Sequence, residues 1–420
     1  MKSMARSSTY LSNAAAKLAI LVLSATVCLA QTDNSLVGPE VAAKTIAATP
    51  PAASVSIVKP AATKASNKRT AGLRRVSAEE ANSVLTIEPE VWMQRANLEL
   101  GLEFSLHYLT GPDSVGDSER LVKAGIEPAR LLQSVKRFRE LLALSDSPAV
   151  LSESLRREFS VYQSVGYDGL GSVRFTGYFQ PVYSASRTRK EHFKFPIFSK
   201  PANFASWPAP HPQRFQLEGK QGTGIDSLLA GSEIAFLPSR FEAFMIHLQG
   251  SAILEMADGE RMAVGFDGAT NHRFVGFSKA WLAQRKISWT KLREFFNEHP
   301  EDLDEYLLRN NRFVFFKENL HSLPVGSLGV PVIPEHSIAT DKALLIPGGL
   351  SVLRTRFPTL DRNGQLALMT QTRIVLDQDT GSAIRGPGRA DVFMGTGAAA
   401  QAAANKLYEK GELYYLLLKQ

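Results

Sequence analysis

The C-terminal part of the chain, residues 325–420, alternates short apolar runs with tight turns, and this pattern constrains the fold more than any other feature. Residues 346–349, 361–364 and 386–388 combine glycine with proline, asparagine or aspartate, which are the residues that tight turns favour. With 30 glycines and 22 prolines in 420 residues, turns are frequent throughout the chain. The sequence therefore predicts a loop-rich β or mixed fold rather than a helical bundle.

Helical spacing is visible in two stretches. Residues 118–159 and 278–310 carry apolar side chains three and four positions apart, which predicts amphipathic helices. Residues 172–199 instead consist of short aromatic and β-branched runs broken by Gly, Pro and Ser, and residues 312–316 form another such run, so both are predicted to be strands. The fold class predicted from these patterns is mainly β, with helices at the start and in the middle of the folded body.

The N-terminus predicts export. Basic residues between Lys2 and Lys17 precede an uncharged, mostly apolar run, residues 18–30, which is too short to span a bilayer and suits a signal peptide. Small residues at Cys28 and Ala30 allow cleavage after position 30. We therefore expect an exported, periplasmic protein.

Two alternatives to a cleaved soluble protein stay open at this terminus. Cys28 could carry a lipoprotein anchor and attach the protein to the outer membrane, although Val27 stands where a lipobox has a small residue. A leader that stays uncleaved as a membrane anchor is the other. Residues 31–83 are rich in Ala, Pro, Thr, Ser and Val, and we expect residues 31–83 to be a flexible linker before a folded body that begins near Val84.

Charge and cysteine content limit the chemistry. The 48 basic and 41 acidic side chains give a formal charge of +7, which favours contact with polyanions. No nucleic-acid-binding signature accompanies this charge, so an anionic wall or membrane is the expected partner and nucleic acid is not. Cys28 is the only cysteine, and its loss with the leader would exclude thiol nucleophiles and cysteine metal sites. The histidines have no metal-ligand spacing and Ser251 lacks a nucleophile elbow, so we expect no metal, no cofactor and no serine hydrolase.

Two carboxylates stand out near the C-terminus. Asp379 follows the predicted strand 372–376 and precedes a glycine-marked turn, and Asp391 opens another short apolar run. Two aspartates at strand ends joined by a compact turn could face one cleft. They could equally cap turns through backbone amides, which is the common structural role of such residues.

Several segments, in consistent order, resemble the MltA family, the membrane-bound lytic murein transglycosylases A. Asp341, Asp379 and Asp391 match the three aspartates of the family's 3D domain. Upstream, three further segments resemble family motifs, namely Gly-Tyr-Tyr-x-Pro, Val-Gln-Gly-Ser on a strand, and Asn-Pro-Ser-Phe-Val-Phe-Phe, at residues 175–182, 246–251 and 310–316. Phe179 replaces a usual tyrosine, Ser382 a usual glycine, and residues 271–273 match an Asn-Gly-His segment only roughly, which puts fine substrate contacts in doubt.

The resemblance implies a two-domain architecture. A double-psi β-barrel would be assembled from residues 84–184, with N-terminal helices, and from residues 325–420. A second β-rich domain, residues 185–324, would be inserted, with a groove for several sugar rings between the two domains.

The resemblance also implies an activity and roles for residues. The family cleaves the β-1,4 bond between N-acetylmuramic acid and N-acetylglucosamine in peptidoglycan and forms 1,6-anhydro-muramic acid ends, so a lytic exotransglycosylase, a glycan-cleaving lyase, is expected. Asp391 matches the single acid/base, which must be protonated when substrate arrives; burial or a nearby like charge such as Asp379 would favour that state. Asp341 would tie a loop of the barrel.

Other residues are assigned to substrate or left between alternatives. Tyr178 and Gln249 are expected in the sugar groove, with a place in the core as the alternative for Tyr178. Arg385 would bind a substrate carboxylate or pair with an aspartate. A non-catalytic wall-binding protein and a hydrolytic glycosidase on the same barrel remain the rival functions. Peptidoglycan strands are the expected partner, and partnership with wall-synthesis or wall-hydrolysis proteins stays open.

Overall fold

The computed structural model describes residues 72–420 except 277–278, 288–290 and 320–322, so the predicted signal peptide and most of the predicted linker lie outside the described residues. The strands are β1 (Leu73–Arg75), β2 (Phe159–Ser164), β3 (Val173–Gln180), β4 (Val182–Ala185), β5 (Phe195–Phe198), β6 (Glu233–Leu237), β7 (Ser251–Met256), β8 (Arg261–Ala269), β9 (Val314–Asn319), β10 (Ser337–Ala339), β11 (Leu350–Leu360), β12 (Leu366–Asp379), β13 (Arg389–Thr396) and β14 (Tyr408–Leu418). The helices are α2 (Ala78–Val84), α3 (Pro89–Met93), α4 (Arg95–Thr110), α5 (Val115–Lys123), α6 (Pro128–Leu144), α7 (Pro148–Glu158), α8 (Arg214–Glu218), α9 (Arg240–Gln249), α10 (Lys279–Gln284), α11 (Leu292–Glu298), α12 (Pro300–Arg309) and α13 (Gly397–Lys406). None of the helices in these ranges is long and apolar enough to cross a membrane.

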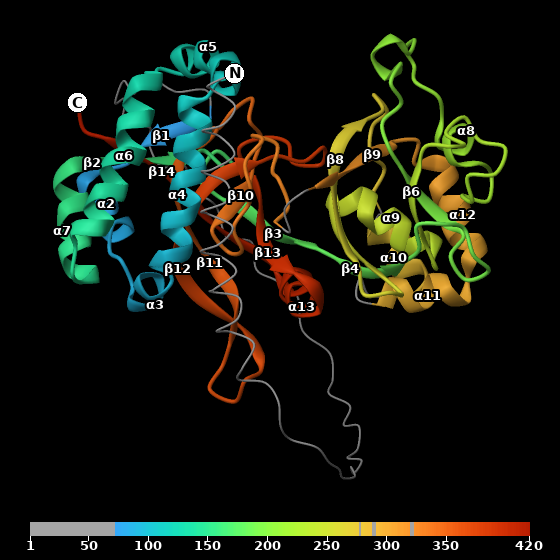
Figure 1. Ribbon diagram of the computed structural model, residues 1–420. Coiled ribbons are helices and arrows are strands. Elements are labelled where there is room, and N and C mark those ends of the chain that lie inside the picture. The colour runs from blue at the N-terminus through green and yellow to red at the C-terminus, as the bar shows by residue number, and fades with distance from the viewer. Residues whose placement is uncertain (1–71, 277–278, 288–290, 320–322) are drawn as a thin grey trace, which may run out of the picture. The chain divides into compact units, whose positions relative to one another are not determined.

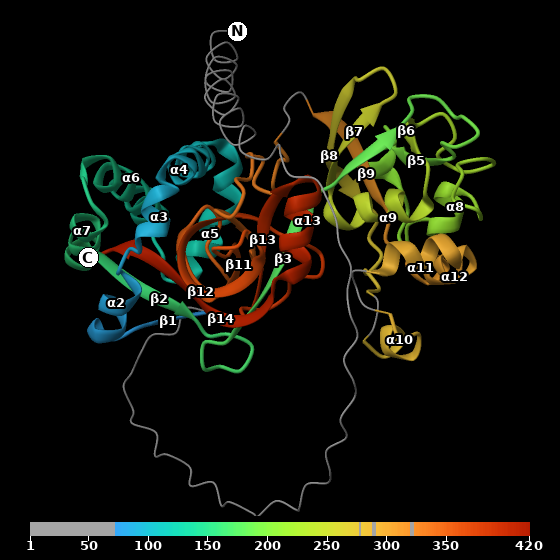
Figure 2. The ribbon, with the colours of Figure 1, turned by 90° about the horizontal axis from the view of Figure 1, so that it is seen from below.

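The largest sheet closes on itself. Its order is β1-β2-β14-β11-β12-β10-β13-β3, and β14 also pairs with β3, so β14, β11, β12, β10, β13 and β3 form a closed six-stranded barrel. Two neighbouring pairs are parallel, β10 with β12 and β13 with β3, while the others are antiparallel. Figures 1 and 2 show these strands wound round one another, with α13 beside β3 and β13. The predicted mainly β fold with a closed barrel is confirmed.

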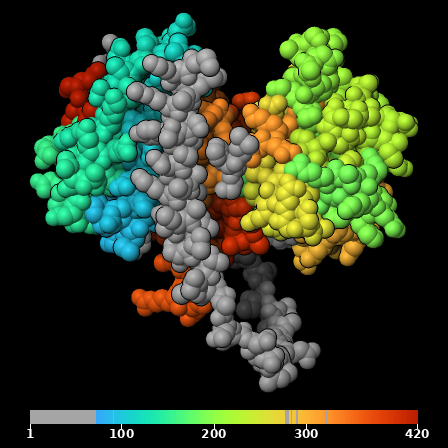
Figure 3. Space-filling model, in the orientation of Figure 1, coloured from blue at the N-terminus to red at the C-terminus, as the bar shows by residue number. Residues whose placement is uncertain are grey.

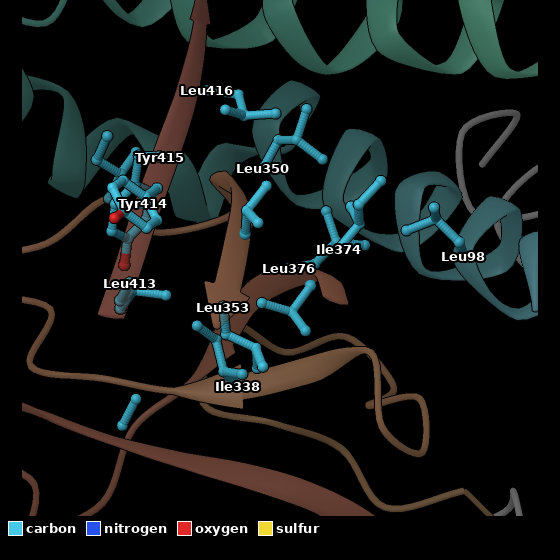
Figure 4. Close-up of a cluster of buried hydrophobic side chains, with 14 of the residues drawn as sticks. Leu98, Ile338, Leu350, Leu353, Ile374, Leu376, Leu413, Tyr414, Tyr415 and Leu416 are labelled. Atoms are coloured by element: carbon cyan, nitrogen blue, oxygen red, sulfur yellow. The ribbon is translucent and has the colours of Figure 1, made fainter. Parts of the chain in front are cut away.

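The barrel is filled by residues from segments far apart in the sequence. Leu350 and Leu353 of β11, Ile374 and Leu376 of β12, and Leu413 of β14 are almost fully buried. Leu353 and Leu413 pair with each other and share one face of the sheet, whereas Leu350, Ile374 and Leu376 lie on the other face, against helix α4, which carries Leu98 (Figure 4). Burying each such side chain stabilises the fold by about 1.5–3 kcal/mol, so this cluster fixes which strands close the barrel. Helices α4, α6 and α7 cover one side of it (Figure 1).

One hairpin reaches beyond the barrel. Strands β11 and β12 pair from Leu350↔Leu376 to Leu360↔Leu366, whereas β14 pairs with β11 only over Ser351–Arg354. Its tip, with Leu360 65% exposed, projects from the surface in the space-filling view (Figure 3). The proximal half of this hairpin belongs to the barrel and the distal half is a two-stranded ribbon.

The residues between β3 and β10 form sheets of their own. Strands β4, β7, β8 and β9 make a four-stranded sheet in that order, and β5 pairs with β6. The side chains of Leu254, Val264 and Phe316 are buried in the core of this region. A second cluster joins α9 to α11 and α12 through Phe244, Phe296 and other aromatic side chains.

Three local predictions need correction. Regular structure begins at β1 and α2, inside the predicted linker 31–83, because Leu73 and Val84 are buried in the barrel core. The residues before Ser251 were expected on a strand, but α9 extends to Gln249 and Gly250 ends it at φ 79°, so the strand starts only at Ser251. Helix α13 falls where only strands and turns were expected, since its alanine-rich sequence has high helix propensity but little amphipathic pattern. The strands within residues 172–199 and the helices within 118–159 and 278–310 are confirmed.

Acid should destabilise the barrel through His336, a prediction that follows from its burial. Its ring is 1% exposed, Nδ1 donates to the Ile374 carbonyl at 3.0 Å, and desolvation lowers its pKa to about 4 from an ordinary 6.5. Between about pH 6.5 and pH 4, His336 is protonated in the unfolded chain but not in the folded chain. Its contribution to the free energy of unfolding is therefore complete above about pH 6.5 and is lost as the pH falls toward 4, by up to roughly 3 kcal/mol. Urea unfolding at pH 7 and pH 5 should show a smaller loss for His336→Gln than for the native chain. An equal loss in both would contradict the prediction.

Candidate functional site

Asp391 lies on β13 between two other strands of the barrel. It pairs with Thr176 of β3 on one side and with Ala339 of β10 on the other. The Thr176 hydroxyl donates a hydrogen bond to Oδ1 of Asp391, and Nε of Arg389 lies 3.3 Å from the same oxygen. Arg389 also reaches the Thr176 hydroxyl at 3.5 Å. The three side chains therefore form one group on one face of β3 and β13.

The two carboxylate oxygens of Asp391 differ. Both contacts fall on Oδ1, and within the described ranges Oδ2 has no hydrogen-bond partner. The side chain is 18% exposed. A carboxyl group held by one oxygen and open at the other can give a proton to a bound group and take one back, which is what a single general acid/base requires.

Asp379 ends β12 and is held by three donors. Its Oδ1 accepts hydrogen bonds from the backbone amides of Ser327 and Thr380, both at 2.8 Å, and its Oδ2 accepts one from the Tyr178 hydroxyl at 2.9 Å. Desolvation raises the pKa of Asp379 although these donors oppose the shift. All of its bonds serve to fix the carboxylate, so its oxygens are less available to a substrate than Oδ2 of Asp391.

Tyr178 is hydrogen-bonded to Asp379 and lies within the electrostatic influence of Asp391. Its ring packs against Phe393 with centroids 5.2 Å apart, and Phe393 lies opposite it in the register of β13 with β3. Burial, followed by the negative charges of Asp379 and Asp391, raises the pKa of the Tyr178 hydroxyl well above 10. The hydroxyl therefore stays protonated and acts as a donor. Asp379 and Asp391 themselves lie opposite the same residue, Ala339, on the two strands that flank β10.

Asp341 is 7% exposed and binds backbone. Its Oδ1 accepts from the amide of Ala343 at 3.1 Å and its Oδ2 from the amide of Gly386 at 2.8 Å. The second bond ties the end of β10 to the loop between Asp379 and Asp391. That loop is also pressed against the segment before β3, because a Cβ on Gly388 would lie 2.2 Å from the Tyr167 amide nitrogen.

The remaining predicted residues are less directly placed. Gln249 accepts the backbone amide of Phe179 at 3.1 Å through its side-chain carbonyl, next to Tyr178. Arg385 is exposed, and over the ranges that the structure covers it forms no ion pair, so its pairing with an aspartate is not observed. Sequence reasoning missed Thr176 and Arg389, since only the pairing of β3 with β13 brings them to Asp391.

A buried charged pair lies beside this group and was also missed. Asp377 is fully buried and accepts from Lys342, from the Thr340 hydroxyl at 2.7 Å and from the Tyr415 hydroxyl at 2.6 Å. Burial raises the pKa of Asp377, and the Lys342 ammonium opposes the shift. These contacts hold the residues that directly follow β10 against strands β12 and β14.

Two family models match the chain. Residues 174–317 match the MltA specific insert domain, and residues 336–417 match the 3D domain. The first match covers the inserted sheets and the second covers the strands that carry Asp379 and Asp391.

Relatives and solved structures agree with these matches. The membrane-bound lytic murein transglycosylase A of Escherichia coli (strain K12) is 28% identical over 269 residues, which cover 62% of this chain and 70% of that protein. The crystal structure of a membrane-bound lytic murein transglycosylase from Agrobacterium tumefaciens has a TM-score of 0.62 at 22% identity, covering 83% of this chain and 98% of the other. That of E. coli MltA with bound chitohexaose has a TM-score of 0.57 at 21% identity, covering 84% and 97%. The fold is shared along most of both chains.

Proposed function

The chain belongs to the MltA family of lytic murein transglycosylases, and we propose that it cleaves peptidoglycan strands with Asp391 as its single acid/base. The curated relatives place it among peptidoglycan-cleaving enzymes of the lyase class. Beyond this enzyme class, we propose which bond is cleaved, which product is formed and which residues take part. The observation that carries it is the carboxylate of Asp391, which is held at Oδ1 by Thr176 and Arg389 and open at Oδ2.

The proposed reaction has two proton transfers through one carboxyl group. Protonated Asp391 gives its proton to the O4 leaving oxygen of N-acetylglucosamine while the C1–O4 bond to N-acetylmuramic acid breaks and oxocarbenium character develops at C1. The resulting carboxylate then takes the proton from the C6 hydroxyl of the same muramic acid, whose oxygen attacks C1 and closes the 1,6-anhydro ring. Asp391 ends protonated again, so the cycle balances.

A single carboxyl group suffices because the nucleophile belongs to the substrate. Hydrolytic glycosidases generally use a second carboxylate as nucleophile or to activate water. An intramolecular hydroxyl needs no such residue and gains from proximity. Asp379 has a supporting role in this proposal, since Tyr178 and two backbone amides already use its oxygens. Tyr178, Gln249 and Arg385 are proposed to contact the glycan, and Asp341 to hold the loop.

Product chemistry tests the proposal. The native chain incubated with purified peptidoglycan should release muropeptides that end in 1,6-anhydro-muramic acid, identified by mass as one water lighter than hydrolysis products. Reducing-end products would replace the transglycosylase with a hydrolase on the same barrel. Tight binding without any product would make the protein a wall-binding module.

Thr176 should act as a positioning residue for Asp391. Thr176→Val keeps the side-chain shape but removes the donor to Oδ1, and we expect kcat to fall about tenfold with KM little changed, which corresponds to the loss of one charge-assisted hydrogen bond. Thr176→Ser keeps the hydroxyl and should retain most of the activity. A Thr176→Ser variant as impaired as Thr176→Val would point to packing rather than to the hydrogen bond.

Export and domain division are proposals of the same kind. Residues 1–30 would direct export to the periplasm, with outer-membrane attachment if Cys28 is lipidated; the relatives are named membrane-bound. The N-terminal mass of the purified protein separates a chain that starts at Gln31 from one that starts at a lipidated Cys28.

The division into barrel residues 84–184 and 325–420 and an insert of residues 185–324 is supported by the separate sheets. If a groove lies between the two parts, hydrogen exchange with a bound glycan should show protection in both.

A further inference from the structure

Three basic side chains lie side by side on three neighbouring strands of the barrel. The register pairs Lys410 of β14 with Arg174 of β3, and Arg174 with Arg389 of β13. Residues opposite one another in neighbouring strands carry their side chains on the same face. The residues that alternate with them, such as Phe175 and Ala390, belong to the barrel core, so the three cations share the outer face. We call Lys410, Arg174 and Arg389 the basic row.

The next row on the same face contains the candidate acid. It pairs Tyr408 of β14 with Thr176 of β3, and Thr176 with Asp391 of β13. Side-chain contacts connect the two rows, since the Arg174 guanidinium lies over the Tyr408 ring at 4.7 Å and Nε of Arg389 lies 3.3 Å from Asp391. The basic row is therefore fixed one step along the strands from the residue that transfers the proton.

Placing like charges opposite one another on adjacent strands destabilises a sheet. Arg389 has Asp391 as a counter-charge, but neither Arg174 nor Lys410 forms an ion pair with a carboxylate in the part of the chain that the structure describes. The nearby Glu409 is engaged with Arg356 at 3.7 Å. A row of cations kept at a cost to folding, beside a catalytic group, indicates an anionic ligand.

We infer that the basic row binds the carboxylates of the stem peptides that muramic acid carries, which selects strands that bear peptides over bare glycan. This inference rests on the proposed function, because Asp391 must act on a muramoyl sugar. The sugar rings of the strand are neutral, whereas a stem peptide carries several carboxylates. A carboxylate held by Arg174 and Lys410 would bring the lactyl side of a muramic acid next to Asp391.

The double variant Arg174→Gln/Lys410→Gln in the full chain tests the inference and leaves Arg389 and its contact with Asp391 in place. With soluble peptide-bearing strands, KM should rise about tenfold at low salt with kcat within about twofold, as expected for the loss of two part-exposed charge contacts. Added salt should raise KM of the native chain more than that of the variant, because screening removes an attraction that the variant lacks. Strands whose stem peptides have been removed by an amidase should be cleaved by both proteins with similar KM, and binding of the neutral chitohexaose should be unchanged.

A matched control removes the same charge elsewhere. Lys136→Gln/Arg139→Gln on the exposed face of α6 also lowers the net charge by two and should leave KM for every substrate unchanged. An equal rise in KM for the control would assign the effect to net charge and overturn the inference. A KM penalty that persists on peptide-free strands, or weaker chitohexaose binding, would assign the row to the glycan instead. If the double variant Arg174→Gln/Lys410→Gln has an unchanged KM for all substrates, the inference about the basic row is overturned. The proposed function still stands in that case if Asp391→Asn abolishes formation of the anhydro product.

Discussion

Replacing Asp391 by asparagine is expected to abolish cleavage, with kcat/KM lowered by about 10³-fold or more, because general acid/base catalysis contributes roughly 10²–10⁴-fold and here one group performs both transfers. The amide is nearly the same shape, and its oxygen can still accept from Thr176 and Arg389. Folding and glycan binding should therefore survive. The measurement is release of anhydro-muropeptides by mass spectrometry, with chitohexaose affinity and the thermal midpoint determined on the same preparation.

Two further substitutions make this experiment specific. Asp361→Asn alters a half-buried aspartate at the tip of the β11–β12 hairpin, where it accepts hydrogen bonds from the amides of Asn363 and Gln365, and this variant should be fully active. Asp379→Asn disturbs the acceptor for Tyr178 and should leave measurable activity, since Asp379 is proposed only to support the site. Full activity of Asp391→Asn would sink the assignment. An inactive Asp379→Asn with an active Asp391→Asn would exchange the two roles.

The second large effect is expected on stability, at the Lys342–Asp377 pair. Removing one partner of a buried ion pair costs about 3–5 kcal/mol, because the other charge is left in an apolar setting. Lys342→Met should destabilise the fold more than Asp377→Asn does. Without Lys342, the fully buried carboxylate of Asp377 has no counter-charge, whereas without the Asp377 charge the Lys342 side chain, which is 12% exposed, can reach water. Against a typical total of about 5–15 kcal/mol, such a loss is large and should be visible in urea unfolding.

The double variant Lys342→Met/Asp377→Asn provides the control. It removes both charges but keeps an oxygen that can accept from Tyr415 and Thr340, so it should recover more than half of the stability that Lys342→Met loses. In Lys342→Met alone, burial raises the pKa of Asp377 further, because only the hydrogen bonds from Tyr415 and Thr340 still oppose the shift. The folded chain then binds a proton that the unfolded chain releases, and stability falls as the pH rises above about 4. If the double variant loses as much stability as Lys342→Met and Asp377→Asn lose together when each is made alone, the two charges do not act as a pair.

The two candidate carboxylates were predictable because their signals are local. Asp379 ends a run of apolar and β-branched residues before a glycine turn, and the structure has β12 end at that residue. Asp391 was placed in another short apolar run, which is β13. Their functional weight came from the order of matching segments along the chain, which the two family models also find. Such local signals did not decide between the two roles predicted for Arg385, namely binding a substrate carboxylate and pairing with an aspartate.

Helices gave mixed results for the same reason. The amphipathic segments α5, α6 and α7 have apolar stripes that a single sequence displays. Helix α13 has mostly alanine on all sides, and α9 is largely buried, so neither shows a polar face that would identify it. The segment around Gln249 was assigned to a strand because it resembles the family's Val-Gln-Gly-Ser strand, whereas in the structure the helix runs to Gln249 and ends at Gly250, which has a left-handed conformation.

The sequence by itself determined the turns, several strand positions and the kind of fold, because periodicity and turn residues act over a few neighbouring positions, while the three aspartates were identified through the resemblance to the family. Only the tertiary structure decided which side chains surround Asp391. Thr176 lies 215 positions from Asp391 in the chain and reaches it through the parallel register of β3 with β13. Arg174 and Lys410 come to the same face through the closure of β14 onto β3. Strand pairing depends on which faces bury the most apolar surface across the whole barrel, and a shift of one residue would turn these side chains to the other face.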